Sequence, residues 1–340
     1  MHQRAAKPGV SVRRFSAEDL PDVLELLDAS LGGGPAGRRP PEFFRWKHLD
    51  NPFGESFLLL AESEGRLVGL RAFLRWRLLA GDRAVSATRA VDTATHPDFQ
   101  GLGIFTRLTL AALDEVRGQV DLVFNTPNAK SGPGYLKMGW REVGRVPVAV
   151  RVRRPLRLLT SRRARPGGPA PAPPVTAAPA AASVLERGQE VAGLLWREPA
   201  APGLATARDL AYLRWRYGAA PLLGYRAVTE ERDGELAGLA IFRVRPRGGL
   251  WETTVAEVLA GGDAGTARRL LRRVVQAAPA DHLTFAAPAG SAAARAATRA
   301  GFLPSPAGIA LVANPLVADL RPDPAELGSW SLSLGDLEVF

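Results

Sequence analysis

Apolar and polar residues follow two different periods along the first part of the chain. Short apolar or alternating runs predict strands at residues 10–14, 57–62, 66–77, 84–95, 120–125 and 141–150. Apolar positions three and four residues apart predict helices over residues 16–30 and 104–117, and a short helix around residues 134–138. Ser16 and Asp19 form the N-cap pair of the first helix. We therefore expect a domain that contains both strands and helices.

The second part of the chain repeats a pattern of the first. Residues 43–73 and 212–242 align without a gap at a constant offset of 169 and are identical at nine positions. Both segments carry Arg-Trp on a predicted short helix, then a loop with proline, then a hairpin that turns at Glu-Gly or Asp-Gly. A duplicated domain explains this better than chance.

A proline-rich stretch separates the two parts. Residues 166–183 hold six prolines and no charged residue, and such a composition buries no core. We expect a first domain over residues 1–155, an Arg/Pro/Ala-rich linker over residues 156–184 and a second domain over residues 185–340. The length of 340 residues fits two domains. Residues 31–40, rich in glycine, are expected to form a mobile loop.

The net charge of +10 is largely local, because seven arginines and no acidic residue lie in residues 151–165. An RNA or another anionic partner would explain this cluster, and so would the codon usage of a GC-rich genome. No aromatic residues interleave these arginines, so a stacking platform for bases is missing and we do not expect a nucleic-acid partner.

The composition also excludes several classes of site. The chain has no cysteine and only four scattered histidines, so it has no disulfide and no thiolate zinc site, and we expect no metal centre. No apolar run approaches the roughly 20 residues that span a bilayer. The first residues lack the apolar core of a secretory signal. We expect a cytoplasmic protein without a membrane partner.

The segment most informative for chemistry lies between the fourth predicted strand and the next helix. The strand ends at Thr95, and Gln100-Gly101-Leu102-Gly103-Ile104 opens the helix. Glycines allow a tight turn and a close approach of the backbone to a ligand, while the first amides of a helix point outward without partners. Such amides, with the helix dipole, bind a pyrophosphate. On these residues alone, a plain turn at a helix entry is about as good an explanation.

Two blocks of sequence together resemble the Gcn5-related N-acetyltransferase (GNAT) family. The pyrophosphate loop of that family reads Gln/Arg-x-x-Gly-x-Gly/Ala, and here Gln100 and Gly103 match while Phe105 replaces the last small residue. The resemblance covers most of residues 9–150.

The second block of the family reads Asn-x-x-Ala-x-x-x-Tyr-x-x-x-Gly-Phe. Asn128, Tyr135 and Gly139 match it, with Ser131 for alanine and Trp140 for phenylalanine. The resemblance implies that the asparagine contacts the pantetheine arm and that Tyr135 protonates the departing thiolate. A phenol, with its usual pKa of about 10, is suited to that proton transfer. The alternative is that Asn128 caps a turn and Tyr135 packs under the sheet.

The resemblance implies the fold class and the donor. It implies an α/β (α+β) protein of two GNAT-like domains, each with a mixed, mostly antiparallel central sheet flanked by helices. It also implies acetyl-CoA as acyl donor, without a metal. The residues implied to hold the donor are Ala94, Thr95, Gln100, Gly101, Leu102, Gly103, Ile104, Phe105, Asn128, Ser131 and Tyr135.

A base must take a proton from the acceptor amine. Asp92, on the strand that leads to the loop, is our candidate for this second catalytic role, with Glu62 and His48 as rivals. Each of the three has the alternative of being a solvated or packing side chain. The terminal carboxylate of Phe340 is a further candidate by similarity of position to the Eis-type acetyltransferases.

The second half lacks these features. After the corresponding strand, the Gln-x-x-Gly-x-Gly spacing is missing, and Asp263 at the helix start competes with phosphate for the helix dipole. Ala297 stands where the first half has Tyr135. We therefore expect a degenerate GNAT domain that scaffolds the first or shapes the acceptor pocket.

The expected function is transfer of an acetyl group from acetyl-CoA to the amine of a small molecule, such as an amino sugar, an amino acid or another metabolite, held in a cleft between the halves. A homodimer is possible. One alternative is a Fem-type aminoacyl-tRNA-dependent transferase, supported by the arginine cluster alone. Another is a non-catalytic CoA-binding or regulatory protein.

Overall fold

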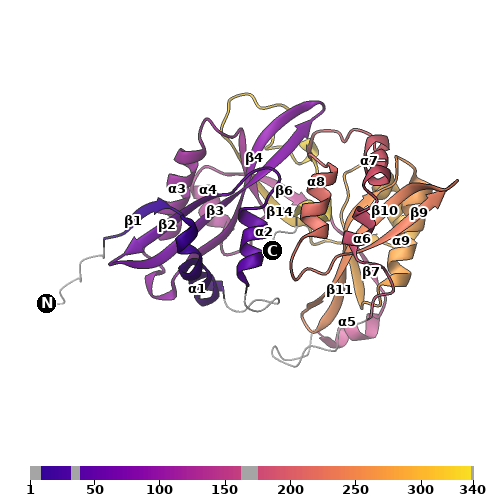
Figure 1. Ribbon diagram of the computed structural model, residues 1–340, viewed down its shortest axis with the longest axis horizontal. Helices are drawn as coiled ribbons and strands as arrows, with labels where there is room; N and C mark the ends of the chain where they lie inside the picture. The colour runs from indigo at the N-terminus through magenta and orange to yellow at the C-terminus, as the bar shows by residue number, and fades with distance from the viewer. Residues whose placement is uncertain (1–8, 32–38, 162–174, 338–340) are drawn as a thin grey trace. The chain divides into compact units, whose positions relative to one another are not determined.

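The computed structural model describes residues 9–31, 39–161 and 175–337, which group into two compact units (Figure 1). The first unit lies within Met1–Arg77, Val85–Glu142 and Val312–Leu320. The second lies within Leu78–Ala84, Val143–Leu311 and Arg321–Phe340. Each unit is thus built from separate stretches of the chain, and each is described by itself below.

The first mixed sheet has the strand order β1-β2-β3-β4-β5-β14-β6. Its strands are β1 (Ser11–Arg14), β2 (Phe57–Ser63), β3 (Arg66–Ala80), β4 (Arg83–Thr95), β5 (Leu122–Asn125), β6 (Arg141–Val146) and β14 (Ile309–Pro315). The helices of the first unit are α1 (Leu20–Leu31), α2 (Pro41–His48), α3 (Ile104–Val116) and α4 (Gly132–Lys137). β4 and β5 run parallel, while β1, β2 and β3 pair antiparallel.

The second unit has its own mixed sheet, with the order β13-β7-β12-β11-β10-β9. Its strands are β7 (Ala149–Val152), β9 (Arg226–Arg232), β10 (Glu235–Arg247), β11 (Leu250–Leu259), β12 (His282–Phe285) and β13 (Leu303–Pro304). Short strands β8 (Leu204–Thr206) and β15 (Trp330–Ser331) pair with each other, and β8 extends the end of β3.

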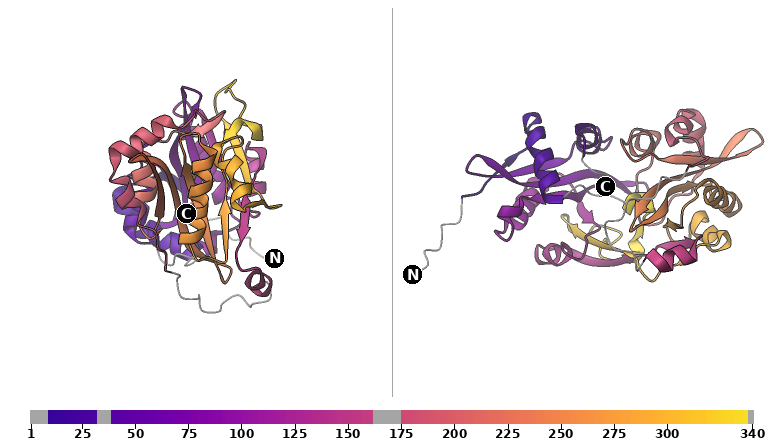
Figure 2. Two further views of the ribbon diagram at one scale, coloured as in Figure 1. Left: turned by 90° about the vertical axis from the view of Figure 1, so that its right-hand side faces the viewer. Right: turned by 90° about the horizontal axis from the view of Figure 1, so that it is seen from below.

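The helices of the second unit are α5 (Pro155–Ser161), α6 (Ala181–Leu185), α7 (Gly188–Arg197), α8 (Leu210–Leu213), a π-helix over Arg214–Gly218, α9 (Ala264–Ala277), α10 (Ala292–Ala297) and α11 (Leu334–Leu337). The left view of Figure 2 shows α9, in orange, lying along the strands of this sheet, and its contacts are with β9, β10 and β11. The two mixed sheets flanked by helices confirm the predicted fold class.

The repeat predicted from the sequence is visible in the elements. Helix α8 and strands β9 and β10 begin 169 residues after α2, β2 and β3, respectively. Both hairpins contain a register shift at the same place, beside Gly69 in one and Gly238 in the other. The two stretches therefore fold alike.

The two glycines explain why a helix packs so closely on each hairpin. A Cβ atom on Gly69 would lie 2.7 Å from Ile104 Cγ2 and 2.9 Å from Leu108 Cδ1 of α3. A Cβ atom on Gly238 would lie 2.6 Å from a methyl carbon of Thr266 in α9. Real Cβ atoms do not approach that closely, so only glycine lets these helices lie against the sheets.

The sheets exchange strands between the halves of the sequence. β7 follows β6 after two residues but lies in the second sheet, between β12 and β13. β14 follows β13 in the chain but lies in the first sheet, between β5 and β6. Our prediction of one strand over residues 141–150 was therefore wrong. The break includes Pro147, which has no amide hydrogen to donate to a ladder.

The predicted division at residues 156–184 stays a prediction, but a single cut there does not describe the discontinuous units. α5 (Pro155–Ser161) overlaps the start of this stretch and α6 (Ala181–Leu185) overlaps its end, while residues 162–174 lie outside the described part. Most of the predicted loop at residues 31–40 also lies outside it.

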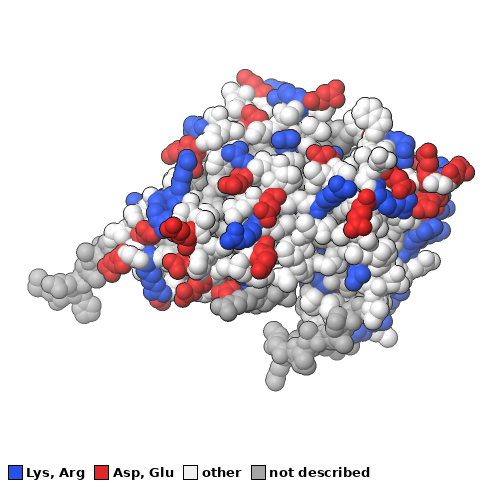
Figure 3. Space-filling model, in the orientation of Figure 1, with Lys and Arg blue, Asp and Glu red and all other residues white. Residues whose placement is uncertain are grey.

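Arginines of the basic cluster bind atoms of the chain itself. The guanidinium of Arg153 donates to the carbonyl oxygens of Val275 and Ala278, at 2.9 and 2.7 Å. Arg154 and Arg157 form ion pairs with the buried Asp281, at 3.5 and 3.2 Å. On the face seen in Figure 3, positive and negative side chains are interspersed. In the described ranges, no helix is both long enough and apolar enough to cross a membrane.

Candidate functional site

The turn between β4 and α3 leaves the beginning of that helix open. Gly101 and Gly103 both have a φ of 78°, in the left-handed region that favours glycine, and both are exposed. Space around them is free, since a Cβ atom on either would meet nothing within 4 Å. Within the described part of the chain, no side chain caps α3. Its first amides are thus available to an anion.

Among the described residues, the end of β4 beside this turn has no ladder partner on the side of β5. β4 and β5 pair in parallel from Ala87 to Arg89, opposite Leu122 to Phe124, while β4 continues to Thr95. Ala94 is buried, while Thr95 is half-buried. A stretch of β4 backbone therefore extends past its ladder with β5, where an extended ligand has hydrogen-bonding groups to use.

The other residues of the loop divide by burial. Gln100 and Leu102 are exposed. Ile104 is buried against Gly69, so only its amide is offered to a ligand. Phe105, which replaces the small residue of the family pattern, turns its ring toward α4. Its ring packs on α4, where a Cβ atom on Gly134 would lie 2.9 Å from Phe105 Cε1.

Asn128 and Ser131 form a local turn. The side-chain oxygen of Asn128 accepts from the amides of Lys130 and Ser131, both at 3.0 Å. This is the turn-capping arrangement that the sequence left open as an alternative. A contact of Asn128 with pantetheine stays a prediction, and its side-chain NH₂ is the group that would make it.

Tyr135 is buried in α4, with 4% of its surface exposed. Its hydroxyl oxygen accepts a hydrogen bond of 2.9 Å from Arg71 Nη1 on β3. The rings of Phe105 and Trp140 lie edge-on to it, at centroid distances of 5.6 and 5.1 Å. The ring of Tyr135 therefore packs under the sheet, and the hydrogen bond from Arg71 fixes the orientation of its hydroxyl.

Asp92 and His48, which the sequence offered as rival bases, belong to one network. Asp92 Oδ2 lies 2.7 Å from Lys47 Nζ and 2.9 Å from His48 Nε2. His48 Nδ1 lies 2.9 Å from the hydroxyl of Ser56. Lys47 and Ser56 were not predicted, because their neighbours in sequence carry no signal for this contact. Asp92 itself has a φ of 40°, a rare backbone conformation for a non-glycine residue.

The charges in this network hold Asp92 ionised. Burial by itself raises the pKa of the Asp92 carboxyl, but the attraction of Lys47 and the hydrogen bond of His48 outweigh it and place that pKa well below its usual range. Burial lowers the pKa of His48, against the opposing effect of Asp92. The neutral ring then donates from Nε2 to Asp92 and accepts from Ser56 at Nδ1. A carboxylate held this way is a poor proton acceptor, which counts against Asp92 as the base.

This network gives a prediction for stability. The Asp92→Asn variant tolerates the positive φ but removes the carboxylate that pairs with the buried Lys47 ammonium, so we expect a loss of about 3–5 kcal/mol at about pH 7. Because the pKa of folded Asp92 is depressed below 3.8, its contribution is present above that value and is lost as the pH falls. Urea unfolding at about pH 7 and about pH 3 should therefore show a smaller difference at the acid pH. An equal difference at both would contradict the ion pair.

The remaining candidate bases lie elsewhere. Glu62 accepts from Arg13 at the edge of the first sheet, at 2.6 and 2.9 Å. The terminal carboxylate of Phe340 lies outside the described residues.

Comparison with known protein families identifies the domain that contains this site. The family described as "Acetyltransferase (GNAT) domain" matches residues 11–143. These residues form a GNAT acetyltransferase domain. The match confirms the resemblance that the two sequence blocks predicted, and no curated protein matches the chain significantly.

Solved structures resemble this chain over most of its length. A conserved protein of unknown function from Enterococcus faecalis, titled a probable N-acyltransferase, has a TM-score of 0.61 at 12% identity and covers 91% of this chain and 73% of its own. A GCN5-related N-acetyltransferase from Anabaena variabilis has a TM-score of 0.60 at 12% identity, with the same coverage. Eis1 from Mycobacterium abscessus has a TM-score of 0.56 at 17% identity and covers 91% and 74%. At these identities the likeness concerns the fold.

The corresponding loop of the second unit is closed by carboxylates. Glu198 Oε1 accepts from the amides of Ala260 and Gly261, the latter at 2.6 Å. Asp263 caps α9 by accepting from the amides of Gly265 and Thr266, both at 3.0 Å. The amides that would receive a pyrophosphate are thus occupied by the protein itself. The sequence identified Asp263 but not Glu198, which lies more than 60 residues away from its partners.

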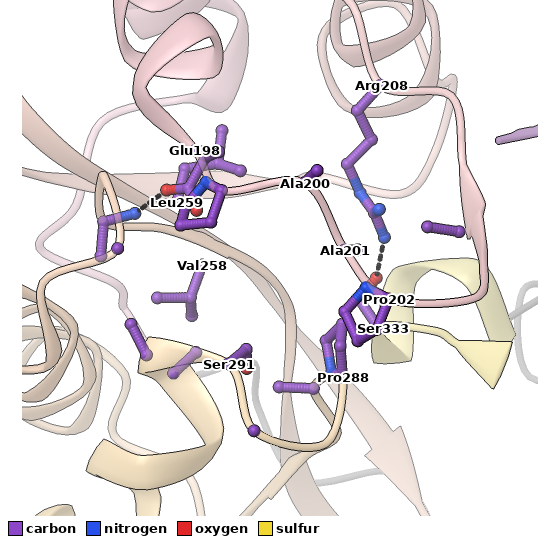
Figure 4. A pocket seen from close by; sticks show the side chains of 18 of the residues that line it. Glu198, Ala200, Ala201, Pro202, Arg208, Val258, Leu259, Pro288, Ser291 and Ser333 are labelled. Carbon is purple, nitrogen blue, oxygen red and sulfur yellow. Dashed lines mark hydrogen bonds between the residues drawn. The ribbon is translucent and has the colours of Figure 1, made fainter. Parts of the chain in front are cut away.

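A cavity of about 500 Å³ lies beside this closed loop (Figure 4). Val258, Pro288 and Ser291 line it, with Glu198 on one side and Arg208 on another. Arg208 is held in an ion cluster with Glu257 and Asp336. The second unit therefore keeps a hollow at the ends of β11 and β12, but its loop amides do not serve a phosphate.

Removing the internal carboxylate should cost stability. In the Glu198→Ala variant, the amides of Ala260 and Gly261 lose their acceptor, and we expect a loss of about 1–3 kcal/mol in urea unfolding. Glu190→Ala is the control, because that exposed carboxylate pairs with Arg187 on the surface, and it should match the parent protein. Equal stability of both variants would show that the amides do not depend on Glu198.

Proposed function

We propose that the protein transfers an acetyl group from acetyl-CoA to the amine of a small molecule, such as an amino sugar, an amino acid or another metabolite. The observation that carries this proposal is the open N-terminus of α3, flanked by Gly101 and Gly103 and free of a side-chain cap in the described residues. The same position in the second unit is filled by Asp263 and Glu198. The contrast supports one phosphate-binding loop, in the first unit.

The residues of the first unit suit the acyl donor. The amides at the start of α3 would bind the pyrophosphate, and the unpaired end of β4 at Ala94 and Thr95 would bind the pantetheine arm. Tyr135, on α4, would stand beside the sulfur as the general acid. GNAT domains generally use acetyl-CoA, which agrees with this set of groups.

The proposed step is an acyl transfer between sulfur and nitrogen. The amine nitrogen forms a bond to the thioester carbon, and the bond from that carbon to sulfur breaks. The proton of the Tyr135 hydroxyl moves to the departing sulfur, and the nitrogen gives its extra proton to a base or to water. The phenolate then recovers a proton from solvent. Holding both substrates together supplies much of the rate by proximity.

The test is release of CoA thiol in the presence of amines. Because the chain has no cysteine, a thiol reagent reports the product without background from the protein. Glucosamine, lysine and hexylamine serve as probes, with acetyl-CoA as donor and calorimetry for its binding. Amine-dependent thiol release supports the proposal. Binding of acetyl-CoA without thiol release from any probe would favour a non-catalytic CoA-binding protein, and the absence of binding would favour a transferase that uses another donor.

A further inference from the structure

Arg71 is a buried cation in the centre of the first unit. It lies on β3 between Gly69 and Phe73, and alternation in a strand places all three on the face that α3 covers. Its relative exposure is 0%, and it is among the largest fully buried side chains of the described residues. Charged side chains are almost never fully buried without a partner of opposite charge. Its position therefore needs an explanation.

The partners of Arg71 are hydroxyls and aromatic rings. Its Nη1 donates to the hydroxyl oxygen of Tyr135 at 2.9 Å and also to the hydroxyl of Thr93. Its Cζ lies 4.9 Å from the ring centroid of Phe73, 5.2 Å from that of Tyr135 and 5.6 Å from that of Phe105. The rings stabilise the cation through their faces.

No carboxylate neutralises this guanidinium within the described ranges of the chain. Its Nε and Nη2 atoms are buried there without a hydrogen-bond partner. Burial lowers the pKa of Arg71, but a guanidinium stays protonated in proteins. The buried positive charge of Arg71 therefore lies within hydrogen-bond distance of the Tyr135 hydroxyl, the proposed proton donor.

We propose that Arg71 is a positioning residue that directs the Tyr135 hydroxyl proton toward the thioester sulfur and stabilises the phenolate left after that proton has moved. This inference rests on the proposed function. A guanidinium only donates, so the Tyr135 oxygen accepts from Arg71 and its own hydrogen must point elsewhere. Charge that develops on the phenol oxygen during proton transfer then forms a stronger, charge-assisted hydrogen bond.

Substitutions of Arg71 separate charge from shape. Arg71→Met fills the aromatic surroundings without charge, and we expect kcat for thiol release with glucosamine to fall about 30-fold, with the Kd for acetyl-CoA within about twofold. Arg71→Lys keeps a charged donor and should recover the rate to within about fivefold of the parent. Arg71→Gln, which keeps a donor without charge, replaces the methionine variant if that one does not fold.

A matched control exists in the second unit. There Arg216 Nη1 donates to the hydroxyl of Tyr225 at 3.1 Å, and both side chains are buried. Arg216→Met makes the same chemical change in the unit whose loop is closed. It should leave kcat within about twofold of the parent protein, whatever it does to stability.

A double-mutant cycle with Tyr135→Phe decides between the proposed role and a structural one. If Arg71 acts through the hydroxyl, Arg71→Met changes kcat less than about twofold once that hydroxyl is gone. An equal loss in both backgrounds, a loss shared by Arg216→Met, or an unchanged kcat in Arg71→Met alone would overturn the proposal while the proposed function stands. A parent protein that binds acetyl-CoA but releases no thiol would overturn both.

Discussion

Replacing Tyr135 with phenylalanine is expected to lower kcat for thiol release about 100-fold to 1,000-fold, while the Kd for acetyl-CoA stays within about twofold. The ring contacts with Phe105 and Trp140 do not involve the hydroxyl, so the substitution removes one oxygen and keeps the packing. The lost oxygen is the proposed proton donor. Steady-state kinetics with glucosamine, together with calorimetry, measure the two quantities separately.

The control for this substitution is Tyr225→Phe. Tyr225 has the same 4% exposure as Tyr135, and its hydroxyl also accepts from a buried arginine. Both variants thus leave a buried guanidinium with one acceptor fewer, and both should lose some stability. Only Tyr135→Phe should lose kcat. A similar fall in both variants would mean that stability, and not proton transfer, limits the rate.

Replacing Gly103 with glutamate is expected to raise the Kd for acetyl-CoA at least 100-fold. This rise corresponds to a loss of binding free energy on the order of 3 kcal/mol. The substitution places a carboxylate at the N-cap of α3, where the positive end of the helix dipole would otherwise receive the pyrophosphate. The parent protein should bind about one equivalent, because the loop of the second unit is occupied by Glu198 and Asp263.

Gly118 supplies a matched control just beyond the other end of the same helix. Its φ is 78°, as at Gly103, and a Cβ atom there also meets nothing within 4 Å. Gly118→Glu therefore has the same backbone strain and the same added charge, away from the loop. It should bind acetyl-CoA like the parent protein. Binding of two equivalents of acetyl-CoA by the parent protein would contradict the closure of the loop in the second unit. A loss of binding in both glutamate variants would mean that backbone strain, and not the added charge, causes the loss.

The local features of the fold were predictable because they depend on neighbours in sequence. The repeated hairpins follow from alternation and from turns at Glu64-Gly65 and Asp233-Gly234, so β9 and β10 begin where the offset from β2 and β3 places them. The opening of α3 follows from glycines near Ile104. Periodicity cannot say which sheet receives a strand, and for this reason the exchange at Pro147 was missed.

The site was predictable only where the family pattern names residues. Arg71 had a weak signal, since it stands between Gly69 and Phe73 at an inward-facing position of an apolar strand, where a charge is out of place. Glu198 had none, because its contacts with Ala260 and Gly261 depend on how the chain folds back. Asp92 was named from the sequence as the candidate base, but in the structure its carboxylate pairs with Lys47 and His48.

The exchange of β7 and β14 between the two sheets constrains how the protein can fold during its synthesis on the ribosome. The first sheet needs residues Ile309–Pro315 between β5 and β6, so the nascent N-terminal half cannot complete its sheet until the chain has been synthesised through β14. Until then, the edges of β5 and β6 are open to other chains. A shortened message that stops after β6 yields an incomplete sheet, and so does one that begins after β7. Neither half of the chain by itself therefore completes its own sheet.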